Sequence, residues 1–328
     1  KIMLLSSFYA GLNAMAPIAL ELLLGYLLAR FKLLKKADFA TLNKFAFSFL
    51  LPFLFFNSMR NADFAANINL FELIVYIVLT ALTIVFGWFY GAKCVKSPNM
   101  KAPAMQAFFR TNCTIFALPI AKTLFPESEL TTMILYMALV IPFLNLLSVI
   151  LLASYGDDNG VKTKVTGKDL LRTIITSPVI LGTIIGIIWN PIQHNLFTFP
   201  TCINSVFTSL GSMSTVLLLI AVGGSLNLDN IKTYGKEVVK FTPLAMVAKP
   251  LVCCLIMMAL GFRGTPLVLG VLILGTPAPV ATVGMAVAQK RDGVFAGLLV
   301  SVCSLISVLT LFLFIFGLGS LGLVSYNF

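Results

Sequence analysis

A polar stretch inside a long apolar segment carries the side chains that are best placed to bind a ligand. It reads RTNCTIFALPIAKTLF, residues 110–125, and places Arg110, Asn112 and Thr114 a few residues before Pro119. A proline inside a helix removes one hydrogen bond and clashes with the preceding turn. We therefore predict that the helix breaks at Pro119, inside protein or beside a watery cavity that satisfies the freed backbone groups.

A second stretch of this kind lies far downstream and reads LGTPAPVATVGMAVA, residues 274–288. It contains Pro277 and Pro279, and Pro277 follows Pro119 by 158 positions. Two interrupted helices at matching places in two halves of a chain are typical of a transporter's substrate site. Two ordinary proline kinks are the alternative interpretation.

The predicted breaks would form a site that favours anions. The half-helix after a break presents unpaired N–H groups and the positive end of its dipole. Residues after Pro119 and after Pro277 would direct two such ends at one cavity, where Asn112 and Thr276 could add hydrogen bonds that orient a ligand. An asparagine in a membrane helix can instead hold neighbouring helices together, and this is the alternative role for Asn112.

Three charged residues are predicted to lie inside the membrane: Glu21, Arg110 and Lys249. A charge at mid-helix costs about 2.5–3.5 kcal/mol on insertion scales, so each is expected to be functional or paired. Lys249 could meet the substrate anion or neutralise the carbonyl ends of the broken helices, and we favour the second role. Arg110 could guard the cytoplasmic mouth or extend toward that side. Glu21 could pair with one of these cations.

The composition predicts a polytopic membrane protein. Of 328 residues, 59% are hydrophobic and 11% charged, and the mean hydropathy is +0.99, which excludes a soluble domain of this size. The net charge of +11 comes without a basic cluster interleaved with aromatic residues, so we expect no nucleic-acid partner. His194 is the only histidine, and six cysteines are scattered. No metal, cofactor or enzyme activity is expected from this pattern.

Ten apolar runs of about twenty residues could cross a bilayer. They are residues 8–29, 39–59, 70–91, 102–125, 130–154, 170–189, 203–225, 238–261, 266–288 and 294–318. The longest polar stretch, residues 155–168, separates two sets of five. We predict an all-α fold of ten transmembrane helices, with residues 1–154 and 169–328 as two five-helix repeats and 155–168 as the loop between them.

The loops predict the orientation of these segments. Loops after odd-numbered segments are basic, whereas the alternate loops are poor in positive charge. The basic residues are Arg30, Lys32, Lys35, Lys36, Lys93, Lys96, Lys101, Lys162, Lys164, Lys168, Arg172, Lys232, Lys236, Lys240, Lys290 and Arg291. By the positive-inside rule, the basic loops are cytoplasmic and both termini are extracytoplasmic.

Matching positions in the two halves indicate an inverted repeat. Gly25 in LLGYLL and Gly182 in ILGTII are 157 positions apart, nearly the spacing of Pro119 and Pro277. An odd number of helices per repeat makes the second half enter the membrane from the opposite side. The two halves are therefore expected to be related by a pseudo-two-fold axis in the membrane plane.

At these motifs the chain resembles the auxin efflux carrier family, which includes plant auxin exporters and bacterial carriers of malate- and malonate-like acids. The resemblance covers nearly all of the chain and is strongest at NCTIFALPIAKTLFP, residues 112–126. This stretch is similar to the family's asparagine-containing motif, with Ala117 in place of its usual glycine. Further matching stretches are LLGYLLARFKLL, LNKFAFSFLLPFLFFNSM, SPVILGTIIG and TPAPVATVGMAVAQ.

The resemblance implies an inverted repeat with two crossed, broken helices in segments 4 and 9. It implies that segments 1, 2, 6 and 7 form a scaffold, through which a homodimer could form. Segments 3–5 and 8–10 would carry substrate by an elevator-like movement. The family's substrate asparagine falls on Asn112, and the scaffold position that touches substrate falls on Leu51. Substrate identity is not carried over, because Ala117, Ala278 and Pro279 depart from common patterns.

We therefore expect a secondary active or potential-driven carrier of small organic anions, mono- or dicarboxylates, in a bacterial inner membrane. The residues expected to bind substrate are Leu51, Thr111, Asn112, Ala117, Pro119, Lys249, Thr276, Pro277 and Ala278. Coupling to Na+ or H+ is left open. The residues that could contribute to coupling are Glu21, Asn145, Ser148, Ser301 and Ser304. A sodium-coupled symporter of bile-acid type and a transporter-like ligand sensor are the alternative functions.

Overall fold

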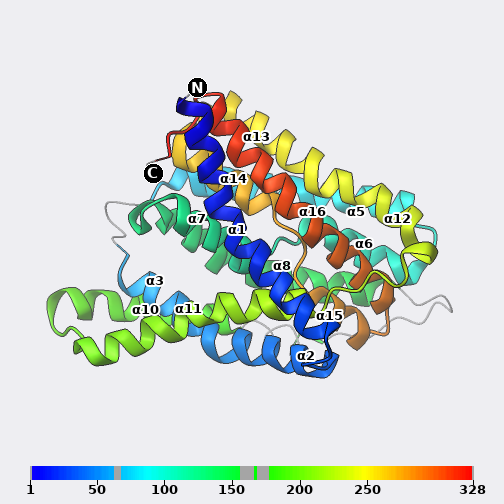
Figure 1. Ribbon diagram of the computed structural model, residues 1–328, viewed down its shortest axis with the longest axis horizontal. Helices are drawn as coiled ribbons and strands as arrows, with labels where there is room; N and C mark the ends of the chain where they lie inside the picture. The colour runs from blue at the N-terminus through cyan, green and yellow to red at the C-terminus, as the bar shows by residue number, and fades with distance from the viewer. Residues whose placement is uncertain (1, 63–67, 156–165, 168–176, 327–328) are drawn as a thin grey trace.

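The computed structural model describes residues 2–62, 68–155, 166–167 and 177–326, and over these ranges it contains helices and no strands (Figure 1). Seven of its helical spans are long and apolar enough to cross a membrane. Their elements are α1 (Ile2–Arg30), α2 (Lys36–Phe45), η1 (Ala46–Leu50), α3 (Leu51–Arg60), α5 (Leu70–Cys94), η3 (Glu127–Leu130), α8 (Thr131–Ser154), α11 (Thr201–Gly224), α12 (Ile231–Pro243), η4 (Leu244–Ala248), α13 (Lys249–Ala259) and α16 (Gly293–Ser320). The chain is thus a multi-pass membrane protein, as its composition predicts.

Shorter helices make up the other three apolar segments. The predicted segments 102–125 and 266–288 are each divided in two, and α10 (Pro178–Asn195) lies in the sixth segment. The divided segments contain α6 (Pro98–Phe109), η2 (Cys113–Ala117), α7 (Leu118–Leu124), α14 (Gly264–Gly275) and α15 (Ala281–Ala288). Most of the predicted connecting loop, residues 155–168, lies outside the described residues, as does the start of the sixth segment.

Three of the prolines inside helical spans follow a π-helix and leave the span unbroken. Pro52, Pro119 and Pro250 each come two residues after a five-residue π-helix, namely η1, η2 and η4. The wider π turn bonds each N–H one residue further back than an α-helix does, so it can accommodate the proline ring. The prediction of a break at Pro119 is therefore wrong. The helix continues through Pro119, and the chain leaves helical geometry upstream, at residues 110–112.

Glycines allow close contacts among α1, α3, α10 and α11. A Cβ atom on Gly25 would collide with the carbonyl oxygen of Ile220 in α11, and one on Gly182 would collide with that of Pro52 in α3. The first predicted segment thus packs on the seventh, and the sixth on the second. In Figure 1, α2, α3, α10 and α11 lie together along the lower edge of the molecule.

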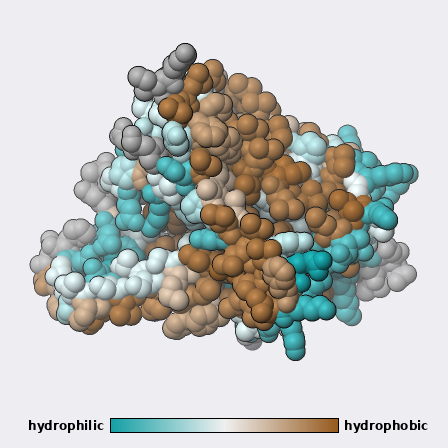
Figure 2. Space-filling view, in the orientation of Figure 1, coloured by the Kyte–Doolittle hydropathy of each residue, from teal (hydrophilic) through white to brown (hydrophobic). Residues whose placement is uncertain are grey.

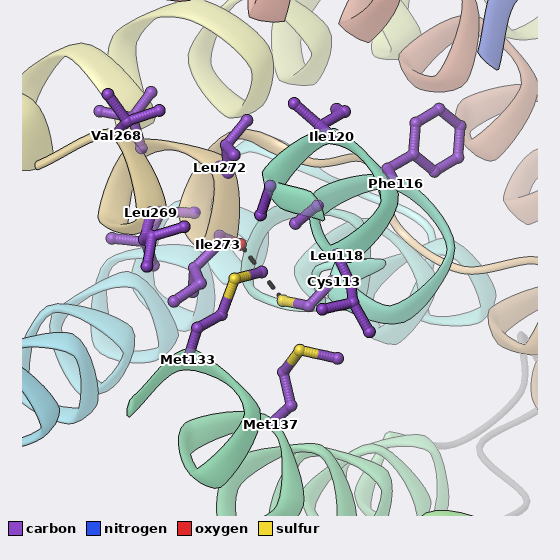
Figure 3. Close-up of a cluster of buried hydrophobic side chains, with 14 of the residues drawn as sticks. Cys113, Phe116, Leu118, Ile120, Met133, Met137, Val268, Leu269, Leu272 and Ile273 are labelled. Atoms are coloured by element: carbon purple, nitrogen blue, oxygen red, sulfur yellow. Dashed lines mark hydrogen bonds between the residues drawn. The ribbon is translucent and has the colours of Figure 1, made fainter. Parts of the chain in front are cut away.

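The broken segments lie in the apolar core. Cys113 of η2 faces α14, and its thiol donates to the carbonyl oxygen of Ile273 at 3.5 Å (Figure 3). Side chains from η2, α7, α8 and α14 fill the space around this contact. Those labelled in Figure 3 are Cys113, Phe116, Leu118, Ile120, Met133, Met137, Val268, Leu269, Leu272 and Ile273, all of which are buried. Such tight packing is the main stabilising contact between helices where lipid replaces water.

The basic ends of several helices meet at one end of the molecule. Tyr90 of α5 donates to the carbonyl oxygen of Lys240 at 3.3 Å, and Arg291 after α15 donates to that of Leu152 at 3.0 Å. The termini lie at another end, close to each other (Figure 1). Figure 2 shows a broad hydrophobic surface over α1, α13 and α16, with hydrophilic residues gathered toward the two sides of the view. This distribution fits helices that cross a bilayer between two polar ends.

Candidate functional site

The two divided segments meet at their breaks. α6 ends at Phe109 and η2 begins at Cys113, while α14 ends before Thr276 and α15 begins after Val280. The backbone N–H of Asn112 donates to the carbonyl oxygen of Pro277 at 2.8 Å. In a continuous α-helix this N–H would bond to the carbonyl four residues back. The break therefore redirects the hydrogen bond of Asn112 from its own helix to the other broken segment.

Side chains satisfy the carbonyl groups that are freed at the breaks. The Lys249 ammonium donates to the carbonyl oxygen of Phe108 at 2.9 Å and lies 5.7 Å from the centre of the Phe108 ring. The carbonyl oxygen of Ile273 accepts from Cys113 and, at 3.4 Å, from the hydroxyl of Thr276. Both helix ends are thus capped inside the protein, as backbone at this depth requires.

A cavity of about 270 Å³ opens beside the breaks. Its walls come from α2 and η1, from the first break and η2, from α8, and from the start of α15. The polar side chains that line it are Asn43, Lys44, Ser48, Arg110, Thr111, Asn112, Thr114 and Asn145. Val280 and Ala281, at the start of α15, also line it. The beginnings of both second half-helices therefore face this cavity. Near these starts, the N–H groups of Phe116, Thr282 and Val283 donate to the carbonyl oxygens of Asn112, Pro279 and Val280.

Arg110 is a buried cation in the cavity wall, 4% exposed. Its guanidinium donates to Asn145 Oδ1 at 2.6 Å, to Gln106 Oε1 at 3.4 Å and to Met285 Sδ at 3.0 Å. All three acceptors are neutral, and within the described ranges no carboxylate forms an ion pair with Arg110. A buried charge normally has a counter-ion. The cavity therefore offers a place where an anion would complete the environment of Arg110.

Asn112 and Thr111 lie next to this cation. Asn112 is 5% exposed and lines the cavity, and its carboxamide makes no hydrogen bond in the part of the chain that the structure describes. The hydroxyl of Thr111 lies 3.1 Å from Cys113 Sγ. The carboxamide of Asn112 lies beside a guanidinium that has no counter-ion in the described ranges. It can donate a hydrogen bond to a ligand there and so fix the orientation of that ligand.

A family model described as "Membrane transport protein" matches residues 10–316. The chain belongs to this family. The family contains the auxin efflux carriers, so the resemblance seen in the sequence is confirmed. A protein from Methanothermobacter thermautotrophicus, named as an uncharacterized transporter, is 22% identical over 291 residues, which are 87% of this chain and 91% of that relative. This member of the membrane transport protein family is a transporter and not an enzyme.

The structure brings together part of the residue set predicted for this membrane transport protein. Thr111 and Asn112 line the cavity together with Arg110, while Pro119 lines a separate hollow of about 280 Å³ with Asn57 and other residues of α3 and α11. The other predicted substrate residues are buried and line neither hollow; they are Leu51, Ala117, Lys249, Thr276, Pro277 and Ala278. For Ala117 and Pro119 the difference follows from the position of the first break, which lies upstream of both residues.

The residues predicted for ion coupling do not form one cluster. Asn145 is bonded to Arg110, and Ser148 donates to the carbonyl oxygen of Leu144, one turn back in α8. In the described ranges no hydrogen bond joins Ser301 or Ser304 of α16 to these residues. Ser148 and Ser301 each donate a hydrogen bond to a carbonyl oxygen one turn back in their own helix.

Glu21 does not pair with either intramembrane cation. It lies in α1, which packs on α11 and α16, and it forms no ion pair in the described ranges. Arg110 and Lys249 belong to the segments around the breaks instead. The expected pairing is therefore wrong, because the fold keeps α1 away from α6 and α13.

The sequence did not single out Asn43, Lys44 and Ser48, which the second segment contributes to the cavity. They occur in LNKFAFSFLLP, where a polar residue recurs every four or five positions before Pro52. That spacing places Asn43, Lys44 and Ser48 near one face of a helix. This pattern is the signal that could have identified a polar wall opposite Asn112.

Proposed function

We propose that this transporter carries small organic anions, mono- or dicarboxylates, and binds them in the cavity beside the two breaks. The observation that carries the proposal is the buried Arg110, whose partners in the described ranges are all neutral and which lies beside Asn112, whose carboxamide makes no hydrogen bond within those ranges. A guanidinium donates two parallel hydrogen bonds to a carboxylate, and the starts of η2 and α15 add favourable potential. A volume of about 270 Å³ suits a small acid and favours it over a sterol acid.

The proposed architecture has ten segments in two inverted halves. Two observations support it: both broken segments meet at matching places, and the matched glycines Gly25 and Gly182 make equivalent contacts, segment 1 on 7 and segment 6 on 2. In this arrangement α1, α2–η1–α3, α10 and α11 form a scaffold. The remaining segments form a unit that moves past the scaffold in an elevator-like step.

The two hollows support alternating access between these units. The 270 Å³ cavity with Arg110 and the 280 Å³ hollow with Pro119 both lie where α2–η1–α3 faces the first broken segment. The buried Leu51 lies in the chain between Ser48, which lines one hollow, and Leu54, which lines the other. In the proposed cycle, movement of the broken segments past Leu51 would transfer the anion from one hollow to the other.

The proposed orientation has both termini extracytoplasmic and predicts that Ser128 and Lys290 lie on opposite faces of the membrane. Ser128→Cys and Lys290→Cys, each in a background that lacks the exposed Cys202, should react with an impermeant thiol reagent from outside and from inside, respectively. Labelling is compared between sealed inverted vesicles, which expose the cytoplasmic face, and sealed right-side-out vesicles, which expose the outer face. Labelling of both positions from one face would contradict the orientation.

The function is tested by ligand binding and then by flux. Purified protein should be stabilised against heating by small carboxylates and not by the corresponding amides, because only the carboxylates supply a negative charge to balance the Arg110 guanidinium. The stabilising acid should then enter proteoliposomes that contain the protein. Binding without flux would favour the sensor, and stabilisation by sterol acids only with sodium would favour the bile-acid type. Stabilisation by neither acid class would contradict an anion site.

Asn112→Ala should lower the affinity for the acid by roughly 10- to 150-fold, the effect of losing one hydrogen bond to a charged group, about 1.5–3 kcal/mol. Isothermal titration on detergent-solubilised protein measures it. Thr276→Val is the matched control, since Thr276 is buried away from the cavity and should leave affinity within about twofold. Equal affinities in well-folded Asn112→Ala and wild-type protein would remove Asn112 from the site.

A further inference from the structure

Glu72 is a buried carboxyl group near the start of the membrane-spanning helix α5. It lies in the first turn of α5, where its backbone N–H is bonded by Asn69 Oδ1 at 3.2 Å, and it is 5% exposed. No ion pair involves Glu72 in the described ranges. A carboxylate in such a place carries a high desolvation cost. Its hydrogen bonds therefore indicate whether the fold favours the protonated or the ionised carboxyl group.

The hydrogen-bond partners of Glu72 require a second proton. The hydroxyl oxygen of Tyr76 lies 2.6 Å from Glu72 Oε1 and 2.6 Å from the carbonyl oxygen of Pro266. A tyrosine hydroxyl has one proton to donate, and the Pro266 carbonyl can only accept. Oxygen atoms this close need a proton between them. Tyr76 supplies one of the two protons, and a protonated Glu72 is the group that can supply the other.

We propose that Glu72 is a proton-binding site and that the proton is bound in this state of the transporter. The neutral acid donates to Tyr76 Oη, and Tyr76 donates to the Pro266 carbonyl. These two hydrogen bonds link α5 to the first turn of α14. Loss of the proton to water leaves a carboxylate that only accepts. It then accepts the one hydrogen bond that the Tyr76 hydroxyl can donate, so the Pro266 carbonyl loses its donor and the link from α5 to α14 opens.

The elements around Glu72 provide no other group that would neutralise it. The helices that pack on α5 are α6, α8, α13 and α14, and their ionisable side chains are Lys101, Tyr136, Lys249, Cys253 and Cys254. Glu129 and Arg263 lie close to Pro266 at the start of α14. Tyr136 is bonded to Thr80, Glu129 to Thr265, and Arg263 to the carbonyls of Met258 and Phe262. In the described part of the chain none of them bonds Glu72, so its state depends on the Tyr76 chain.

The position of α14 connects this proton to transport, and this step rests on the proposed function. α14 carries Pro266 in its first turn and ends at the break, where the Pro277 carbonyl oxygen accepts from the N–H of Asn112. A change in the packing of α14 on α5 therefore acts on the same pair of breaks that lines the anion cavity. We expect uptake of the anion to be accompanied by a proton that binds and leaves Glu72.

Infrared spectroscopy of purified protein tests the proton site without transport. Wild-type protein near neutral pH should show a carboxylic-acid C=O band that Glu72→Gln removes. Tyr76→Phe should shift the band, because the acid loses its hydrogen-bond acceptor. Glu21→Gln is the matched control, a second glutamate in a membrane-spanning helix whose replacement should leave this band in place. An unchanged acid band in Glu72→Gln, with loss of carboxylate absorption instead, would overturn the proposal. In wild-type protein alone, the band should disappear reversibly at high pH.

A flux measurement separates this inference from the proposed function. In proteoliposomes, a pH gradient should accelerate uptake of the stabilising carboxylate by wild-type protein. Glu72→Gln should lose that acceleration and keep the affinity for the acid, since Glu72 does not line the cavity. An acid band with no carboxylate flux would refute the carrier function and leave the proton site standing. Carboxylate flux that ignores pH in wild-type protein would refute proton coupling and leave the carrier function standing.

Discussion

Replacing Arg110 with glutamine should weaken binding of a carboxylate by more than roughly 100-fold and leave binding of the matching amide almost unchanged. Arg110 can donate two hydrogen bonds to a carboxylate, and each bond to a charged group is worth about 1.5–3 kcal/mol. Glutamine keeps part of the length and a donor that can reach Asn145. The variant should therefore fold, and its defect should lie in binding.

The ratio of acid to amide affinity is the measurement that decides this prediction. Arg110→Lys is the companion variant: it keeps the charge and loses the fork-like geometry, so its ratio should fall between those of wild type and Arg110→Gln. Monodisperse elution and an unchanged melting temperature without ligand show that the variants are folded. An Arg110→Gln protein that still prefers the acid as strongly as wild type does would show that the anion binds elsewhere.

The fold class was predictable because hydrophobicity decides it. Apolar runs long enough to span a bilayer determine where membrane helices lie, and the ends of α5, α8, α11 and α16 agree with the predicted segments to within a few residues. The break in the first half was harder to place. Proline usually marks such a break, but the π-helix η2 accommodates Pro119. The chain leaves helical geometry at residues 110–112, where no proline occurs.

The composition of the site was less accessible to sequence reasoning. Asn112 was recognisable because it is polar, lies near a proline and matches a family motif. The cavity wall from Asn43 to Ser48 depends on which face of α2 and η1 turns toward the breaks, and that is decided by packing between distant segments. Glu72 was hidden for a similar reason. At the start of a membrane segment a glutamate reads as an interface residue, and only its contact with Tyr76 and Pro266 shows that it is buried.

Lys249→Gln should lower thermal stability and leave the preference for acid over amide nearly intact. The Lys249 ammonium donates to the Phe108 carbonyl oxygen at 2.9 Å, and the helical partner of that carbonyl, the N–H of Asn112, is bonded to Pro277. Removing the ammonium leaves Phe108 without a charged donor at the end of α6. The loss is about 1.5–3 kcal/mol, the value of one hydrogen bond to a charged group.

The competing role, direct contact with the substrate, predicts the reverse pattern. Lys249 is buried and does not line the cavity that holds Arg110, so its charge acts on the end of α6 rather than on a ligand. Lys249→Arg is the matched variant: it keeps a cation within reach of Phe108 and should recover part of the stability lost in Lys249→Gln. Melting temperature and the acid-to-amide affinity ratio are measured on the same preparations. A stable Lys249→Gln protein that no longer distinguishes acid from amide would place Lys249 at the substrate and would contradict its role as a brace between α13 and the first break.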